Sequence, residues 1–336
     1  MPDHLRDPLR GGHGHLYTAA PMKGRVLSPF ATQLRRVGSR LNVLRERHVP
    51  ARAERSVAGY WTRHNVTRHH EFASVADSLA FFQWRSSIYH DYLSLMPVSG
   101  FDDKVVLDYG CGPGHDLVGF GHFSRPARLI GMDVSSSSLA ESRDRLRLHA
   151  IPCQLHQLSE SDPQIPLEDD SVDYIHSSGV LHHVPDPVAI LKELARVLRP
   201  GGECRIMIYN YDSVFLHLHV PYVVQLKQGM YRDDSLRAAF RRTTDGVRVP
   251  ISEVYEPSAW IAIMERAGFA CEFTGAAVSM LEMQVLAHRA DAIIDRRLAQ
   301  EHREFLLALR FDDGGWPLAP SGHRAGIDGC FLARLS

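Results

Sequence analysis

The sequence has 336 residues, with 38 Lys and Arg side chains, 39 Asp and Glu side chains and a formal net charge of −1. With 44% hydrophobic and 23% charged residues, it has the composition of an ordinary globular protein. This argues against a uniformly basic nucleic-acid binder, a disordered acidic chain and a collagen-like repeat. The five cysteines are scattered without a Cys-x-x-Cys pair. This pattern argues against a disulfide framework and a structural zinc site, and it favours a cytoplasmic location.

The charge is distributed unevenly along the chain. Residues 1–55 contain eleven basic and four acidic side chains, a net charge of +7, so the remaining residues carry −8. Glycine and proline are frequent in the first thirty residues, which predicts coil, and apolar residues at helical spacing predict a basic helix over 31–47. We therefore expect 1–55 to be a basic, partly disordered extension. It lacks the apolar core of a secretory signal peptide, and no apolar run in the chain reaches membrane-spanning length.

The next elements predict an α/β domain. Residues 56–100 have a helical pattern rich in aromatic side chains and are predicted to form a helical N-terminal cap. Five short apolar runs then alternate with helical patterns, and they predict strands at 104–109, 127–132, 152–157, 172–177 and 203–209. Strands that alternate with helices indicate right-handed crossovers and a parallel, doubly wound sheet.

Two of the intervening helices carry start signals. Ser138 with Glu141 three residues later predicts a capping box. Asp186 before Pro187 predicts an N-cap followed by proline at the first helical position.

The pattern is less regular after residue 209. We expect residues 101–275 to form the core, with an insertion at 210–256, and residues 276–336 to add a helical lid segment and a closing strand. Within these ranges the sequence predicts the following elements: a helix at 257–267, a strand at 269–274, a long helix at about 279–309 and a strand at 329–335.

A glycine-rich turn follows the first predicted strand. Asp108 and Tyr109 end that strand, and Gly110, Gly112 and Gly114 follow before the next helix. Glycines at such a position permit positive φ and let a ligand approach the bare backbone. The second predicted strand ends at Asp133, whose carboxylate can accept hydrogen bonds from both hydroxyls of a ribose.

The same stretch argues against a dinucleotide. Counting Gly-x-Gly-x-x-Gly from Gly110 puts His115 at the third glycine position, and counting from Gly112 puts Leu117 there. Asp108 also adds negative charge where a pyrophosphate would come close, whereas a cationic sulfonium ligand would pay no such penalty. An NAD-dependent oxidoreductase is therefore the weakest enzyme hypothesis.

Five ordered motifs resemble the class I S-adenosylmethionine-dependent methyltransferases, in particular the type 11, quinone-biosynthesis-like small-molecule branch. The motifs are Asp108-x-Gly110-x-Gly112-x-Gly114, Gly131-x-Asp133-x-Ser135, the segments 165–173 and 180–187, and 198–202. The resemblance implies a Rossmann-like sheet of seven mostly parallel strands whose last strand is antiparallel, with helical cap insertions. It also implies S-adenosyl-L-methionine as the cofactor.

The resemblance also implies a set of cofactor contacts. Residues 109–112 would contact the methionine part, Asp133 the ribose and Val134 the adenine. Where many relatives carry an acid for the adenine amino group, this chain has Ser161, so the choice among Glu160, Ser161 and Asp162 stays open. The expected cofactor-binding residues are Arg85, Asp108, Tyr109, Gly110, Cys111, Gly112, Gly114, Asp133, Val134, Ser161, Asp162 and Ser178.

Methyl transfer chiefly requires that the nucleophile and the methyl group be held in line. A general base is needed only where the acceptor must lose a proton. The candidate bases are His182 and His183 after the fourth strand, with Tyr209 as a residue of the acceptor pocket; loop orientation, helix capping or core packing are the alternative roles. No metal site is predicted, because the two His-x-His pairs, at 13–15 and 217–219, lack completing ligands.

The leading functional hypothesis is methyl transfer to N, O or C of a small-molecule acceptor, with the helical segments before residue 100 and from about 276 to 310 as a lid over the acceptor. One alternative is an RNA or protein methyltransferase that uses the basic extension as a phosphate clamp, although the acidic body argues against nucleic acid. Another is a catalytically silent cofactor-binding subunit. The sequence predicts no membrane partner and leaves the oligomeric state open.

Overall fold

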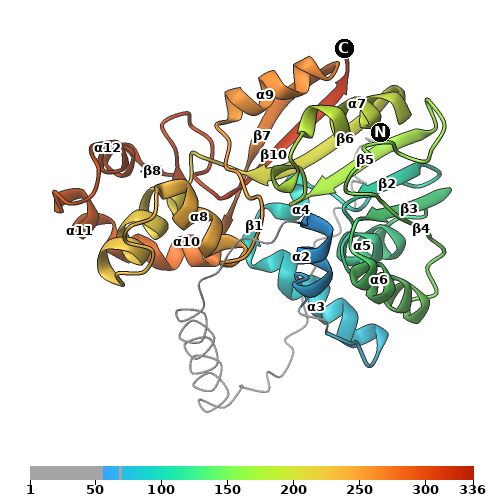
Figure 1. The fold of residues 1–336 in the computed structure, drawn as a ribbon, viewed down its shortest axis with the longest axis horizontal. Coiled ribbons are helices and arrows are strands. Elements are labelled where there is room, and N and C mark those ends of the chain that lie inside the picture. The colour runs from blue at the N-terminus through green and yellow to red at the C-terminus, as the bar shows by residue number, and fades with distance from the viewer. Residues whose placement is uncertain (1–55, 68–69) are drawn as a thin grey trace, which may run out of the picture. The chain divides into compact units, whose positions relative to one another are not determined.

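The computed structural model describes residues 56–67 and 70–336, and the predicted basic extension and its helix lie outside these residues. An eight-stranded sheet with the strand order β1-β7-β10-β6-β5-β2-β3-β4 is the centre of the fold (Figure 1). Its strands are β1 (Tyr89–His90), β2 (Val105–Tyr109), β3 (Arg128–Asp133), β4 (Gln154–Gln157), β5 (Val172–Ser178), β6 (Leu198–Tyr209), β7 (Phe269–Ser279) and β10 (Asp328–Leu335).

The strand directions confirm the predicted sheet. β2 pairs in parallel with both β3 and β5, and β4 and β6 extend the parallel part on either side. The last strand, β10, is antiparallel to β6 and β7. The two-residue strand β1 adds an eighth strand at the edge, which the sequence analysis did not predict. Because the carboxyl ends of parallel strands meet at one edge, the residues that follow β2, β3 and β5 lie close together.

Helices cover both faces of the sheet (Figure 1). The covering helices are α3 (Val75–Ser87), α5 (His115–Phe123), α6 (Ser136–Leu148), α7 (Pro187–Val197) and α9 (Pro257–Arg266). One hydrophobic cluster contains Phe82 of α3 and residues of α5 and α6. A second contains Trp260 of α9 and residues of α7. The two clusters share the strands between them, which is the layered arrangement that buries both faces of a parallel sheet.

The helix starts follow local capping chemistry, with one correction. The Asp186 carboxylate accepts hydrogen bonds from the amides of Val188 and Ala189, so this predicted N-cap is confirmed. The predicted capping box of Ser138 and Glu141 is wrong. Ser135 caps α6 by accepting a hydrogen bond from the amide of Ser138, since the helix begins three residues earlier than expected.

The described residues form further helices. They are α2 (Val57–Arg63), α4 (Tyr92–Leu95), the 3₁₀-helix η1 (Leu181–His183), the π-helix η2 (Phe215–Lys227), α8 (Leu236–Thr244), α10 (Met280–Val285), the 3₁₀-helix η3 (Leu286–His288), α11 (Arg289–Ile294) and α12 (Gln300–Ala308). Of these, α8, α10, α11 and α12 gather beside the end of the sheet that is away from β4 (Figure 1). A two-stranded hairpin, β8 (Arg310–Phe311) and β9 (Pro317–Leu318), follows α12. No helix in the described part of the chain has the length and apolar character needed to cross a membrane.

The long helix predicted at about 279–309 is wrong. Strand β7 continues to residue 279, and the helical residues after it are divided among α10, η3, α11 and α12. The break before α12 has a local cause at Asp295, whose carboxylate accepts hydrogen bonds from the backbone amide and the guanidinium of Arg297. Such a side-chain to backbone bond competes with helical hydrogen bonding and ends the helix.

Glu282 joins three segments of the C-terminal part. Its carboxylate closes a capping box with Ser279 at the start of α10. It also accepts hydrogen bonds from the amide of Phe215 at the start of η2, at 3.1 Å, and from the amide of Ile327 before β10, at 3.3 Å. The side chain is fully buried, so these bonds replace water as its hydrogen-bonding partner.

We expect Glu282→Gln to lower the free energy of unfolding by about 1–3 kcal/mol, because the amide nitrogen cannot accept a hydrogen bond and a buried donor is left unpaired. Chemical denaturation of the full chain measures this loss. Glu272→Gln is the control, since Glu272 is an exposed carboxylate on β7. Equal denaturation midpoints for the two variants would contradict the role of Glu282.

Candidate functional site

The glycine turn after β2 is tied to the end of β3. The amides of Gly110 and Cys111 both donate to the carbonyl oxygen of Met132, at 2.7 and 2.9 Å. The amide of Gly112 donates to Oδ2 of Asp133 at 2.8 Å, and the amide of Ser135 donates to Oδ1 at 2.7 Å. The turn and the second strand end therefore form one rigid rim.

Two glycines keep this rim open. Gly110 has φ +78°, and a Cβ built on it would lie 2.2 Å from Cγ2 of Val180. Gly112 has φ +52°, and a Cβ there would meet nothing within 4 Å. Both positions use a backbone conformation that favours glycine, and the space beside Gly112 leaves its backbone accessible to a ligand.

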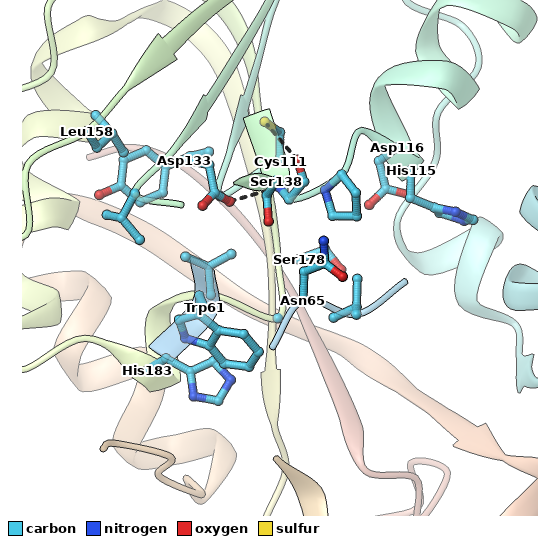
Figure 2. Close-up of a pocket in the computed structure, with 18 of the residues that line it drawn as sticks. Trp61, Asn65, Cys111, His115, Asp116, Asp133, Ser138, Leu158, Ser178 and His183 are labelled. Carbon is cyan, nitrogen blue, oxygen red and sulfur yellow. Dashed lines mark hydrogen bonds between the residues drawn. The ribbon is translucent and has the colours of Figure 1, made fainter. Parts of the chain in front are cut away.

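A cavity lies over this rim (Figure 2). The structure brings together nine of the residues predicted from the sequence, which line it: Arg85, Tyr109, Gly110, Cys111, Gly112, Asp133, Val134, Ser178 and His183. In Figure 2, Asp133 and Cys111 lie on one side of the cavity, and the rings of Trp61 and His183 lie together on the other. These two rings have centroids 4.9 Å apart.

Two residues of the glycine motif lie outside the lining. Asp108 is 1% exposed and sits behind the turn, where its strand register pairs it with His176 of β5. Gly114 faces α6 instead, because a Cβ on it would lie 2.6 Å from Oγ of Ser142. Their side of the turn packs against the protein rather than facing a ligand.

The expected adenine contacts are also placed elsewhere. Ser161 and Asp162 are exposed and line neither cavity described here. The Glu160 carboxylate holds the start of α2, accepting hydrogen bonds from the hydroxyl of Ser56 and from the amides of Val57 and Ala58. The Glu160 carboxylate thus has a structural role that its position in the sequence does not reveal.

Sequence reasoning missed the contribution of α2 and the residues after it. Trp61, Asn65 and Val66 line the cavity, as do Leu158 and Asp116. The aromatic pattern of 56–100 predicted a helical cap but could not tell which of its side chains faces the glycine turn.

A buried charge pair lies beneath the cavity. Nε2 of His176 is 3.4 Å from Oδ2 of Asp116, and both side chains are buried. Burial alone would raise the pKa of the Asp116 carboxyl, but the hydrogen bond and charge of His176 outweigh it and hold that pKa well below its usual range. Burial raises the pKa of Asp108, with His176 opposing and the Asp116 carboxylate adding to it. Asp116 therefore carries the negative charge, and Asp108 is the protonated member of the group.

Arg85 lines the same cavity as Asp116 and lies close enough to interact with its charge. Within 56–67 and 70–336, its guanidinium has no hydrogen bond and no ion pair with another residue. Burial would lower its pKa, but the nearby Asp116 carboxylate and the hydroxyls of Tyr92 and Tyr89 raise it. A charged, unpartnered guanidinium at a cavity wall is suited to bind the carboxylate of a ligand.

A second cavity adjoins the first and shares Trp61, Val66, Arg85, Ser178, Gly179 and His183 with it. Tyr209, predicted at the acceptor pocket, lines this second cavity, together with Tyr89, Tyr92, Met207, Asp245 and Asp328. His182 lines neither cavity. It is fully buried, and its ring lies 3.9 Å from that of Tyr209, so it is a packing residue.

Asp245, in the loop after α8, organises the wall that the two cavities share. Its carboxylate accepts hydrogen bonds from the hydroxyls of Tyr209, Thr244 and Ser252, at 2.9, 2.7 and 2.7 Å. Nε2 of His183 lies 3.7 Å from Oδ1 of the same carboxylate.

The other nitrogen of His183 fixes its tautomer. Nδ1 lies 2.8 Å from the carbonyl oxygen of Ile251, which can only accept. Nδ1 therefore carries the proton, and Nε2 keeps its lone pair in the neutral ring.

Comparison with known proteins assigns this architecture. Residues 107–206 match the family Methyltransf_11, described as a methyltransferase domain. The chain is 32% identical to trans-aconitate 2-methyltransferase of Azoarcus sp. (strain BH72) over 137 residues, 40% of this chain and 50% of that protein. It is 31% identical to the ubiquinone biosynthesis O-methyltransferase of Aeromonas salmonicida (strain A449) over 113 residues, 33% and 45% of the two chains.

A third relative, the tRNA U34 carboxymethyltransferase of Aliarcobacter butzleri (strain RM4018), is 32% identical over 131 residues, 39% of this chain and 41% of that protein. The matched segment thus spans half or less of each of these relatives. The segment 107–206 that matches the family contains the glycine turn and Asp133. Residues 107–206 therefore form a class I S-adenosylmethionine-dependent methyltransferase domain.

The cofactor of this domain family is S-adenosylmethionine, and the residues at the rim fit it. Each oxygen of Asp133 accepts one backbone hydrogen bond, so the carboxylate has further lone pairs for two ribose hydroxyls. The open space beside Gly112 admits a ligand against the backbone, and the unpartnered Arg85 guanidinium suits an α-carboxylate. Burial raises the pKa of the Cys111 thiol, which makes this residue a packing group and not a nucleophile.

We expect Gly110→Ala to weaken binding of S-adenosylhomocysteine by about ten-fold or more, because the added Cβ forces Val180 into the cavity, at a cost of about 1.4 kcal/mol. Isothermal titration measures the affinity. Gly201→Ala is the matched control, since Gly201 has φ +80° and its Cβ would meet nothing within 4 Å. The steric explanation fails if both variants bind the ligand equally well.

Proposed function

We propose that this protein transfers the methyl group of S-adenosylmethionine to N, O or C of a small-molecule acceptor that binds in the second cavity. The observation that carries this proposal is the junction of the two cavities at Ser178, Gly179 and His183. A ligand on the rim and a ligand in the second cavity would meet at these residues. The lining of the second cavity combines hydroxyl, carboxyl and aromatic groups, which is typical of a site for a small organic molecule.

The proposed cofactor contacts follow from the lining of the first cavity. Asp133 would bind the ribose, Val134 and Leu158 would pack against the adenine, and Arg85 would bind the α-carboxylate. When bound, S-adenosylmethionine supplies a methyl group that its sulfonium has already activated. The protein therefore has mainly to orient the acceptor beside the rim and exclude water.

His183 is the proposed general base for an acceptor that must lose a proton. Its Nε2 lines the junction of the cavities, and the Ile251 carbonyl leaves that nitrogen with the lone pair. Asp245 lies close enough to stabilise the imidazolium that forms when the ring takes a proton. Tyr209 would orient Asp245 through its hydroxyl and form part of the acceptor wall.

We further propose that residues 56–100 and the insertion 210–256 cover the acceptor. The first segment contributes Trp61, Tyr89 and Tyr92 to the second cavity, and the insertion contributes Asp245. Among the described residues, none from 276–310 lines either cavity. We therefore assign the helices of that segment to support of the insertion, because η2 packs in one hydrophobic cluster with residues of α10, α11 and α12.

An RNA acceptor is the competing proposal, since one relative is a tRNA carboxymethyltransferase and residues 1–55 are basic. The enclosed lining of the second cavity favours a small molecule. A catalytically silent cofactor-binding subunit would have no need for a base at the junction.

Asp133→Ala should weaken binding of S-adenosylhomocysteine by about ten-fold or more, because it removes hydrogen bonds to a charged acceptor and releases the Gly112 amide. Isothermal titration of each protein with S-adenosylhomocysteine, and separately with NAD, measures the two affinities. Asp144→Ala, at an exposed position on α6, should bind as the natural chain does. Equal binding by Asp133→Ala, or preferential binding of NAD, refutes the cofactor site.

His183→Ala should lower turnover by about 10²-fold or more on an acceptor that must be deprotonated, the scale of general-base catalysis, while binding of S-adenosylhomocysteine persists. Transfer of a labelled methyl group to the small molecules of a cell extract provides the assay. His122→Ala, at the exposed end of α5, is the control. Normal turnover by His183→Ala would eliminate this base, and label found only in RNA would overturn the small-molecule acceptor.

A further inference from the structure

The second cavity has a lining that indicates the charge of its occupant. Four aromatic side chains line it, and they come from four separate elements: Trp61 of α2, Tyr89 of β1, Tyr92 of α4 and Tyr209 of β6. Aromatic rings attract cations through the negative charge of their faces, and groups of such rings are the usual protein site for ammonium ligands.

Two carboxyl groups complete this lining. Asp245 accepts hydrogen bonds only from neutral hydroxyls, so no cation among the described residues other than the nearby His183 ring offsets its charge. Asp328, at the start of β10, is 4% exposed, and no group in residues 56–67 or 70–336 donates a hydrogen bond to its carboxyl. A buried carboxyl without a donor loses its solvation without compensation, and a ligand that donates to it removes that penalty.

The pKa of the Asp328 carboxyl is consistent with the absence of a hydrogen-bond donor beside it. Burial and, to a smaller extent, the nearby Glu282 raise the pKa of its carboxyl to about 8, although Arg85 opposes the rise. A cation bound beside the carboxyl would favour its ionised form and would be bound by it in turn.

Among the described residues, Arg85 is the one Arg or Lys side chain in the lining of the second cavity, and it also lines the first cavity. Under the proposed function, the Arg85 guanidinium binds the α-carboxylate of the cofactor. That carboxylate neutralises the positive charge of Arg85, so Arg85 does not repel a cationic acceptor. The acidic groups then left to face the acceptor are Asp245 and Asp328, with His183 between the cavities.

We propose that the methyl acceptor is an organic amine, which enters the second cavity as its ammonium ion, donates to Asp328 and lies among the aromatic rings. This inference rests on the proposed function and names the acceptor class for that same site. It also gives His183 a defined task, because an ammonium nitrogen has no lone pair until it loses a proton.

The steps balance without a further reactant. The ammonium proton passes to Nε2 of His183 and then to water. The lone pair of the neutral amine forms the new N–C bond as the C–S bond of the cofactor breaks, and that electron pair stays on sulfur in S-adenosylhomocysteine. The nitrogen keeps its two remaining hydrogens, so the product forms directly as a methylammonium ion, and one proton is released per turnover.

The test uses the full chain saturated with S-adenosylhomocysteine and three matched series of probes. Each series offers an amine, an alcohol and a carboxylic acid on one scaffold: 2-phenylethyl, 2-(indol-3-yl)ethyl and n-hexyl. Isothermal titration at neutral pH should show at least one ammonium that binds about ten-fold or more tightly than its alcohol and its carboxylate. Asp328→Asn should remove about ten-fold of that affinity, the scale of a hydrogen bond between charged groups.

Asp313→Asn is the matched control, because Asp313 is exposed and lies outside the cavity lining. Both variants should keep the affinity of the natural chain for S-adenosylhomocysteine, which shows that Asp328→Asn is folded. The inference is overturned if no ammonium is preferred, if a carboxylate binds most tightly, or if Asp328→Asn binds the ammonium unchanged. Failure of the natural chain to bind S-adenosylhomocysteine would instead refute the proposed function itself.

Discussion

The Asp133 carboxylate is the contact on which the site depends. It lies at the end of β3 and accepts hydrogen bonds from the amide of Gly112 in the glycine turn and from the amide of Ser135 at the start of α6. Burial raises the pKa of this carboxyl, and the two amides oppose that rise by stabilising its ionised form. One side chain thus fixes the turn after β2, begins the helix after β3 and presents lone pairs to the cavity.

The electrostatics of the rim suit a cationic cofactor better than an anionic one. The ionised Asp116 lies at the start of α5, where a pyrophosphate would otherwise bind the helix N-terminus, and it is held there by His176. Asp108 behind the turn is protonated, so the rim does not carry two adjacent negative charges. Arg85 on the opposite wall supplies a positive group for a carboxylate. The sequence argument considered the charge of Asp108 alone and missed Asp116, whose pKa the hydrogen bond and charge of His176 hold low.

The sequence predicts those parts of the site that local chemistry determines. The glycine turn, Asp133 and the helix start at Asp186 all depend on residues within a few positions of one another, so pattern and spacing were enough. Asp245 and Asp328 reach the second cavity through long-range packing and through the position of β10 between β6 and β7, which no local pattern reveals. The role of Glu160 was missed for a related reason. Its carboxylate binds the start of α2, a helix that lies about a hundred positions earlier in the chain.

Helix α2 covers the proposed acceptor site. Glu160 holds the amino end of this helix, and the hydroxyl of Ser137 donates to the carbonyl of Thr62 at 2.6 Å. The hydroxyl of Tyr60 donates to the carbonyl of Asp245, so the helix is also bonded to the loop after α8. Trp61 therefore covers His183 from a helix that is fixed at both ends and along its length. The residue whose carboxylate lies beside the proposed base is thus also bonded, through its carbonyl, to the helix that covers that base.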